Sequence, residues 1–262
     1  MSDYKAISFE KNDQIATIML NQPERRNPLT WSTAWEIVAA FKEAEQDDDV
    51  RVIILAAAGK TFCAGGDLAE MAGFIKMTAL ELRDGGKAYP ALYKAIRNIE
   101  KPVIAKVHGP ALGGGCGMVA CCDIAIASDK AKFATTEINV GMFPMVIAPI
   151  LTHTIGRKKT MELGLTGAII DAQEAMRIGL INRVVPEDQL DAAVMELANQ
   201  IKARSNVPIR IGKTALNVME DMDFDKALEY ARHTNTIWFT STDVKEGTDA
   251  FLEKRKPVWK DC

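Results

Sequence analysis

The sequence has no strong excess of charge and no long apolar run. Its 262 residues include 32 Lys and Arg and 35 Asp and Glu, which gives a formal net charge of −3. Without a basic field the chain is not expected to bind nucleic acid. No uninterrupted apolar run approaches the roughly 18 residues that a membrane helix needs, so no membrane partner is expected. The acidic start MSDYKAISFE is not typical of a signal peptide.

Cysteines are few and form no recognisable pairs. The five are Cys63, Cys116, Cys121, Cys122 and Cys262. Because no C-x-x-C pair is matched by a second one, we predict no zinc site and no other metal site. Two adjacent cysteines in an apolar run are typical of reduced core residues. They predict a reducing compartment, for which the cytoplasm is the primary expectation and an organelle matrix the alternative.

The hydrophobic pattern predicts an α/β core followed by a helical C-terminal region. Residues 5–20 read as a hairpin, and VRVIILAAA, VIAKV and DIAIA read as buried strands. Helices are predicted near 30–45, with Trp31, Trp35 and Val38 on one face, and over 80–99. Strands alternate with helices in the first half and helices dominate the end. The predicted division is a core at 1–200 and a helical region at 201–262.

Two glycine-rich turns each follow a predicted strand and precede a predicted helix. They are CAGGDL, from Cys63 to Leu68, and ALGGGCGM, from Ala111 to Met118. A helix start leaves backbone N–H groups unpaired, and glycine allows a ligand to approach them. Two such turns on neighbouring strands can form an oxyanion hole. The alternative is that they only close tight loops, since neither fits a dinucleotide-binding or P-loop motif.

The order of several segments resembles that of the crotonase, or enoyl-CoA hydratase/isomerase, superfamily. The matching segments are NQPERRNPLT, GKTFCAGGDLAEM, KPVIAKVHGPALGGGCGMVACCDIAIAS, AKFATTEINVGMFP, LTGAIIDAQEAMRIGLINRVVP and EGTDAFLEKRKPVW. The resemblance implies a spiral of ββα turns, C-terminal helices that build a trimer or hexamer, and an acyl-CoA thioester substrate. It implies no cofactor beyond the coenzyme A of that substrate. It also implies that the Ala64 and Gly114 amides bind the thioester oxygen, with Gly65 and Gly66 opening the approach.

The resemblance also points to residues that contact the coenzyme A or the acyl chain. These residues are Arg25, Arg26, Asn27, Gly66, Asp67, Gly117, Met142, Phe143 and Lys254. Arg25 or Arg26 can pair with a phosphate, although for either one alone a solvated charged loop is slightly favoured. Asp67 is more simply a helix N-cap. The family's aromatic partner of Lys254 is missing, because the aligned position is Asn235.

Only one of the two glutamates used by the family's hydratases is present. Glu137 matches one of them, and Gly117 stands in place of the other. One carboxylate can move a proton from Cα to Cγ while the oxyanion hole holds the dienolate, whereas hydration divides its duties between two. We therefore expect an isomerase or a specialised hydratase, with Glu137 in an apolar pocket that raises its pKa. The missing side chain at Gly117 predicts room for a branched or cyclic acyl group.

Two other classes of function stay open. An acyl-CoA decarboxylase or hydrolase can use the same oxyanion hole, and release of CO2 or free coenzyme A identifies it. A non-catalytic protein that binds coenzyme A is the further alternative, against which the presence of Glu137 argues.

Overall fold

The computed structural model describes residues 4–261, so Cys262 and the first three residues lie outside the described part. A six-stranded sheet has the order β1-β2-β3-β4-β6-β9, and only β1 and β2 pair antiparallel. Its strands are β1 (Ile7–Asn12), β2 (Ile15–Leu20), β3 (Val52–Ala57), β4 (Val103–Val107), β6 (Ile124–Ser128) and β9 (Arg183–Val185). A smaller sheet has the order β5-β7-β8. Its strands are β5 (Ala111–Leu112), β7 (Lys132–Ala134) and β8 (Ile170–Asp171).

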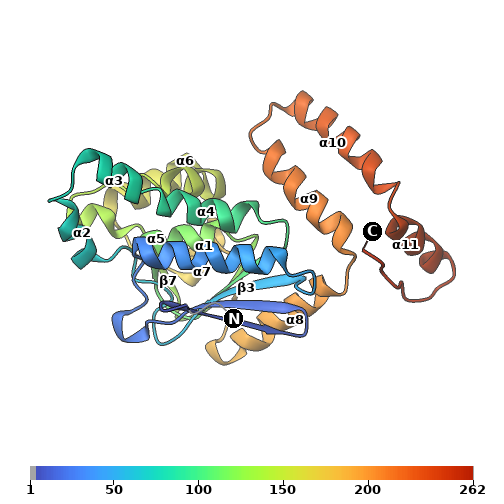
Figure 1. The fold of residues 1–262 in the computed structure, drawn as a ribbon, viewed down its shortest axis with the longest axis horizontal. Helices are drawn as coiled ribbons and strands as arrows, with labels where there is room; N and C mark the ends of the chain where they lie inside the picture. Colours follow the sequence, from blue (N-terminus) through green and yellow to red (C-terminus); the bar gives the residue numbers. More distant parts are fainter. Residues whose placement is uncertain (1–3, 262) are drawn as a thin grey trace.

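Helices cover the sheets and form the end of the chain (Figure 1). The α-helices are α1 (Trp31–Gln46), α2 (Leu68–Phe74), α3 (Ala79–Gly85), α4 (Ala88–Asn98), α5 (Gly114–Cys121), α6 (Ala148–Thr166), α7 (Ala172–Arg177), α8 (Leu190–Lys202), α9 (Asn206–Met219), α10 (Phe224–Trp238) and α11 (Thr242–Leu252). Short 3-10 helices are η1 (Pro23–Arg25), η2 (Thr136–Val140) and η3 (Glu187–Gln189). The predicted hairpin and buried strands are confirmed.

The central strand β3 is buried on both faces, as its continuous apolar sequence predicts. Successive side chains of a strand point to opposite faces. Ile53 and Leu55 accordingly join the main core, whereas Val52, Ile54 and Ala56 join a second cluster. That second cluster includes three residues of α8, which are Leu190, Val194 and Ala198. The parallel sheet is therefore enclosed between two layers of helix.

Two predicted helices differ in detail. The helix expected over 80–99 is divided into α3 and α4. Pro90 has no N–H to bond the carbonyl of Gly86, so the hydrogen-bond ladder is interrupted there. In α1 the buried face differs from the predicted one. Ile37 and Phe41 are buried, whereas Trp35 is 48% exposed.

The last three helices extend from one end of the body, away from α2 and α3 (Figure 1). α9 packs on α10, and its contact with the body runs along α4. None of the helices formed by the described residues combines the length and the apolar character that a membrane crossing requires. This placement puts the glycine turns in the core and far from the C-terminal helices.

Candidate active site

The two glycine turns are joined by backbone hydrogen bonds. The Cys63 N–H donates to the Pro110 carbonyl at 3.1 Å, and the Leu112 N–H donates to the Cys63 carbonyl at 2.9 Å. Gly65 has a φ of +93°, which an L side chain rarely adopts. A Cβ placed on it would also lie 3.1 Å from the Leu112 carbonyl oxygen. The close approach of the two turns therefore depends on glycine at this position.

The structure corrects one of the two amides predicted to bind the thioester oxygen. The Ala64 N–H donates to the Arg26 carbonyl at 3.0 Å, so it is already used within the chain. The Gly66 N–H, two residues further on, bonds to no acceptor among the described residues. The Gly114 N–H is the first of α5 and has no partner within that helix. The free pair of amides is thus Gly66 and Gly114.

Glu137 lies against the second glycine turn. It belongs to η2, which follows β7, and the Gly113 N–H donates to the Ala134 carbonyl of β7 at 2.8 Å. A Cβ placed on Gly113 would lie 3.0 Å from Glu137 Oε1. The other oxygen, Oε2, is buried and has no hydrogen-bond partner among the described residues. Burial raises the pKa of this carboxyl above its ordinary value.

These groups line a single pocket of about 400 Å³. Its residues are Leu29, Ala64, Gly65, Gly66, Leu68, Met71, Tyr89, Tyr93, Gly113, Gly114, Thr136, Glu137, Asn139, Val140, Met142, Phe143, Pro144, Met145, Val146 and Ile147. Among these described lining residues, Glu137 carries the only carboxylate, and most of the others are apolar. The pocket is within the size range of small-molecule sites.

The structure overturns the prediction that Gly117 leaves free volume for the acyl group. A Cβ placed on Gly117 would lie 2.5 Å from Ile147 Cγ2 and 3.2 Å from Tyr93 Cε1. Gly117 itself is buried and is not among the pocket residues. Two side chains from other elements therefore occupy the space that its own side chain would have filled.

The family model described as enoyl-CoA hydratase/isomerase matches residues 10–262.

The chain belongs to the enoyl-CoA hydratase/isomerase family.

Individual relatives agree with that assignment and with the crotonase fold. A protein named crotonyl-CoA hydratase from Syntrophomonas wolfei is 36% identical over 255 residues, which cover 97% of each chain. The mouse protein named enoyl-CoA hydratase domain-containing protein 3, mitochondrial, is 36% identical and covers 98% of this chain and 85% of its own. The crystal structure of an enoyl-CoA hydratase from Mycobacterium smegmatis superposes with a TM-score of 0.94 at 33% identity, covering 98% of this chain and 99% of the other. The chain is an acyl-CoA enzyme of the hydratase/isomerase type.

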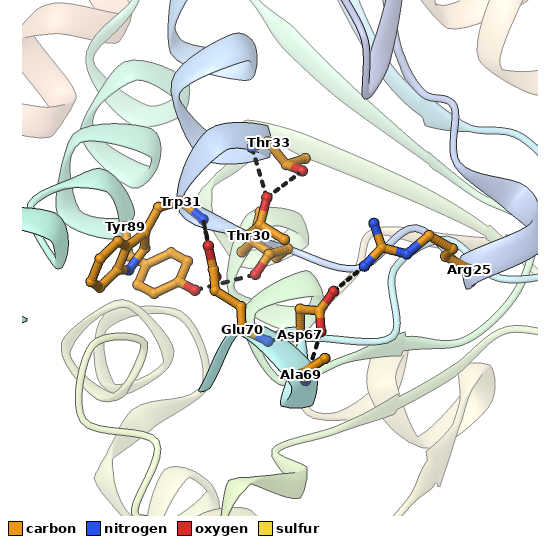
Figure 2. Close-up of polar contacts among 9 residues, drawn as sticks. Arg25, Thr30, Trp31, Thr33, Asp67, Ala69, Glu70 and Tyr89 are labelled. Atoms are coloured by element: carbon orange, nitrogen blue, oxygen red, sulfur yellow. Dashed lines mark hydrogen bonds and ion pairs between the residues drawn. The ribbon is translucent and has the colours of Figure 1, made fainter. Parts of the chain in front are cut away.

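Arg25 and Asp67 form an ion pair (Figure 2), and Asp67 lies in sequence between the pocket residues Gly66 and Leu68. Asp67 also caps α2, because its Oδ1 accepts hydrogen bonds from the N–H groups of Ala69 at 2.8 Å and Glu70 at 3.2 Å. The N-cap interpretation of Asp67 is thus confirmed. Half of the Arg25 side chain is exposed, so a phosphate can reach its guanidinium beside Asp67.

Glu70 connects α2 to the start of α1. Its carboxylate accepts from the Trp31 N–H at 3.2 Å, while the Tyr89 hydroxyl donates to the Leu29 carbonyl at 3.2 Å (Figure 2). Trp31 in turn stacks on Phe74, with ring centroids 4.4 Å apart. The Glu70 and Phe74 contacts hold α2 against the start of α1, whereas the Tyr89 contact ties α4 to the loop before α1.

Asn27 and Lys254, which were also predicted to contact coenzyme A, are not among the residues that line the pocket. The Asn27 side chain is buried, and its amide donates to the carbonyls of Ala58 at 2.9 Å and Thr61 at 2.8 Å. Both donor hydrogens of the Asn27 amide are therefore used within the chain. The Asn27 side chain holds the loop in place and has no donor left for coenzyme A. Lys254 follows α11, which lies at the opposite end of the molecule from α2 and α3 (Figure 1). Within one chain, its neighbours belong to the C-terminal region.

The cysteines near the turns are not in a position to act as nucleophiles. Cys63 and Cys116 are fully buried, and burial raises the pKa of each thiol to about 12. Both thiols are protonated at neutral pH. The residues that sequence reasoning missed are Tyr93 and Ile147. No local motif marks either one, because each reaches the site from a separate helix or loop.

Proposed function

We propose that the enzyme moves a double bond in an acyl-CoA from C3 to C2. The observation that carries this proposal is the single carboxylate of the described pocket lining, Glu137, in a pocket whose wall toward Gly117 is apolar. Ile147 and Tyr93 fill the place where a second acidic side chain would stand. A hydration site has to hold a water by several polar groups, whereas a proton shift along the acyl chain needs one base.

In this proposal the amides of Gly66 and Gly114 bind the thioester oxygen. Both N–H groups are free of intramolecular acceptors among the described residues, and both residues line the pocket. As the Cα proton leaves, negative charge moves onto that oxygen, and two fixed N–H donors stabilise the dienolate. One donor of this kind is worth about 100- to 1,000-fold in rate. An acyl-CoA complex with the carbonyl oxygen 2.7–3.1 Å from both nitrogens is the expected structure.

Glu137 is the proposed base and acid. Its carboxylate takes a proton from Cα of the 3-enoyl thioester, and the electron pair moves into the conjugated dienolate. The same carboxyl then returns the proton to Cγ, which leaves the double bond between Cα and Cβ. Burial raises its pKa, so the group takes up and gives back a proton more readily near neutral pH.

The test compares Glu137→Gln with Glu45→Gln on 3-enoyl-CoA. Formation of the conjugated thioester is followed by ultraviolet absorbance. We expect a 100- to 10,000-fold loss of kcat for Glu137→Gln. Glu45 in α1 is a half-buried carboxylate outside the pocket lining, and burial raises its pKa as it does that of Glu137, so its variant is the matched control and retains the wild-type rate. Retention of the rate within about 10-fold in Glu137→Gln shows that another group is the base.

Hydration is the second candidate, and the names of the relatives favour it. Several relatives, such as the crotonyl-CoA hydratase at 36% identity, are named as hydratases. Loss of the conjugated absorbance with 2-enoyl-CoA, and formation of the 3-hydroxyacyl product, would identify this activity. A higher kcat/KM for that reaction than for isomerisation overturns the isomerase assignment. Release of CO2 or free coenzyme A would instead indicate decarboxylation or hydrolysis.

We also propose self-association through the last three helices, as a trimer or a pair of trimers. Support comes from large apolar side chains that are exposed in the single chain, among them Phe224, Phe239 and Phe251. Coenzyme A is proposed to enter as part of the substrate, with Arg25 or Arg26 near its phosphates and no separate cofactor. If Lys254 contributes, it does so from a neighbouring copy.

A further inference from the structure

Gly113 and Gly117 lie on the same side of the first turns of α5. They are four residues apart, and the Gly117 N–H donates to the Gly113 carbonyl at 3.2 Å. The groups that cover these two glycines differ. Glu137 Oε1 covers Gly113, and Ile147 Cγ2 covers Gly117. An apolar side chain is therefore the neighbour of the carboxylate along this face.

Ile147 is held firmly in that place. It is 2% exposed, it directly precedes α6, and its carbonyl accepts the Leu151 N–H at 2.9 Å. Tyr93, from α4, closes the other side of the same space. Its hydroxyl donates to the Gly114 carbonyl at 3.2 Å, which fixes the ring against the second turn. Both side chains also line the pocket, so the filled space is part of its wall.

We propose that Ile147 determines substrate specificity, because it closes the wall beside Glu137 and restricts the enzyme to acyl groups without a branch at the reacting carbons. The inference rests on the proposed function. The reacting carbons must lie between the Gly114 amide and the Glu137 carboxylate, since one binds the thioester oxygen and the other handles the protons. A methyl branch on these carbons would approach the wall formed by Ile147 and Tyr93.

The size of the effect follows from how pockets distinguish small apolar groups. One added or missing methylene changes kcat/KM by about 10- to 200-fold. Truncating Ile147 to alanine removes three carbons from the wall while leaving Glu137 and both amides in place. We therefore expect a gain for branched substrates and little change for straight ones.

The contact is tested first, without any substrate, by a thermal-denaturation cycle of Gly117→Ala and Ile147→Ala. Gly117→Ala alone should lower Tm, because its Cβ would lie 2.5 Å from Ile147 Cγ2. In the Ile147→Ala background the same change should lower Tm much less or raise it. Such non-additivity measures the contact directly. Equal shifts in both backgrounds would show that Ile147 does not fill this space.

The selectivity is then measured as a ratio of kcat/KM values. The substrates are a straight 3-enoyl-CoA and its 2-methyl derivative of the same chain length. We expect the branched-to-straight ratio to rise about 10-fold or more in Ile147→Ala and by an intermediate amount in Ile147→Val. Ile150→Ala is the matched control, since Ile150 is outside the pocket lining, and its ratio should equal that of the wild type.

Circular dichroism checks that each variant is folded, and Ile147→Val keeps the test valid if Ile147→Ala is not. Equal ratios in wild type, Ile147→Ala and Ile147→Val overturn the proposal, as does a wild type that turns over both substrates equally well. Failure of the isomerase function is recognised separately. In that case neither 3-enoyl-CoA is converted, and the same ratio is taken from the Kd values of saturated straight and 2-methyl acyl-CoAs. A Kd ratio that Ile147→Ala leaves unchanged likewise rejects the proposal.

Discussion

Apolar side chains are buried in the core around the glycine turns, whereas many of them are exposed on the C-terminal helices. All six residues of β3 are buried within the chain. In contrast, α10 has no buried residue, and Phe239 and Phe251 are 73% and 83% exposed. The core is therefore complete in one chain, whereas the C-terminal helices present a surface that another copy can cover. Apolar side chains therefore pack the interior in one region and lie at the surface of the single chain in the other.

Polar contacts tie the last residues of the chain and α11 to the segment just before α9. Asp243 is 2% exposed and accepts hydrogen bonds from the Ser205 hydroxyl at 2.6 Å and from the Lys260 N–H at 2.7 Å. The Trp259 indole N–H donates to the Ala203 carbonyl at 2.9 Å. A buried carboxylate that is satisfied in this way fixes the geometry of the C-terminal segment. The catalytic carboxylate Glu137 is the opposite case, since one of its oxygens is buried without a partner.

The largest expected effect is on self-association through the C-terminal helices. Leu228→Glu places a charge in the exposed apolar stripe of α10, where Leu228 is 55% exposed. Loss of its burial should weaken self-association by about 2 kcal/mol, or roughly 30-fold, as measured by analytical ultracentrifugation. Ile75→Glu, at a residue that is 89% exposed between α2 and α3, is the control and should not change the mass. A wild-type protein that is monomeric at high concentration would contradict the proposed assembly.

Two glycine substitutions, one in each region, should change the free energy of unfolding with opposite signs. Gly115→Ala in α5 puts a Cβ 2.6 Å from Cys63 Cβ, so we expect destabilisation by about 1–3 kcal/mol. Gly212→Ala in α9 meets nothing closer than Trp238 Cζ2 at 4.0 Å, so helix propensity dominates and should stabilise by up to about 1 kcal/mol. Denaturant midpoints measure both. Shifts of the same sign would show that the two regions are packed alike.

The smallest effect is the pH dependence of stability at Glu137. Because its folded pKa is raised, the ionised form is disfavoured in the folded state, and this destabilisation is present above the folded pKa. Glu137→Gln removes it. The Tm of the variant should exceed that of the wild type at pH 7 by about 2–4 °C for each kcal/mol gained. The difference should shrink as the pH falls through the folded pKa and vanish below the unfolded value, near pH 4. An equal difference at pH 7 and pH 4 would mean that the charge is not its cause.

The sequence alone was sufficient for features that follow from local rules. Continuous apolar runs marked the buried strands, Asp67 marked a helix N-cap, and the ordered segments marked the family. Hydrophobic period, capping chemistry and turn composition depend on residues close together in the chain, so they can be predicted without a fold. The division of the helix at 80–99 was also local, since Pro90 lies within it, but its consequence was missed.

Only the tertiary structure decided which amide is free and what fills the space at Gly117. The Ala64 N–H is used by the Arg26 carbonyl, which leaves Gly66 as the available donor. Ile147 reaches Gly117 from a loop 30 residues later in the chain. Both facts depend on contacts between segments distant in sequence, and no periodicity or motif encodes such contacts. The types of residue that carry the chemistry of the site could therefore be predicted from the sequence, whereas the shape of the pocket depends on packing.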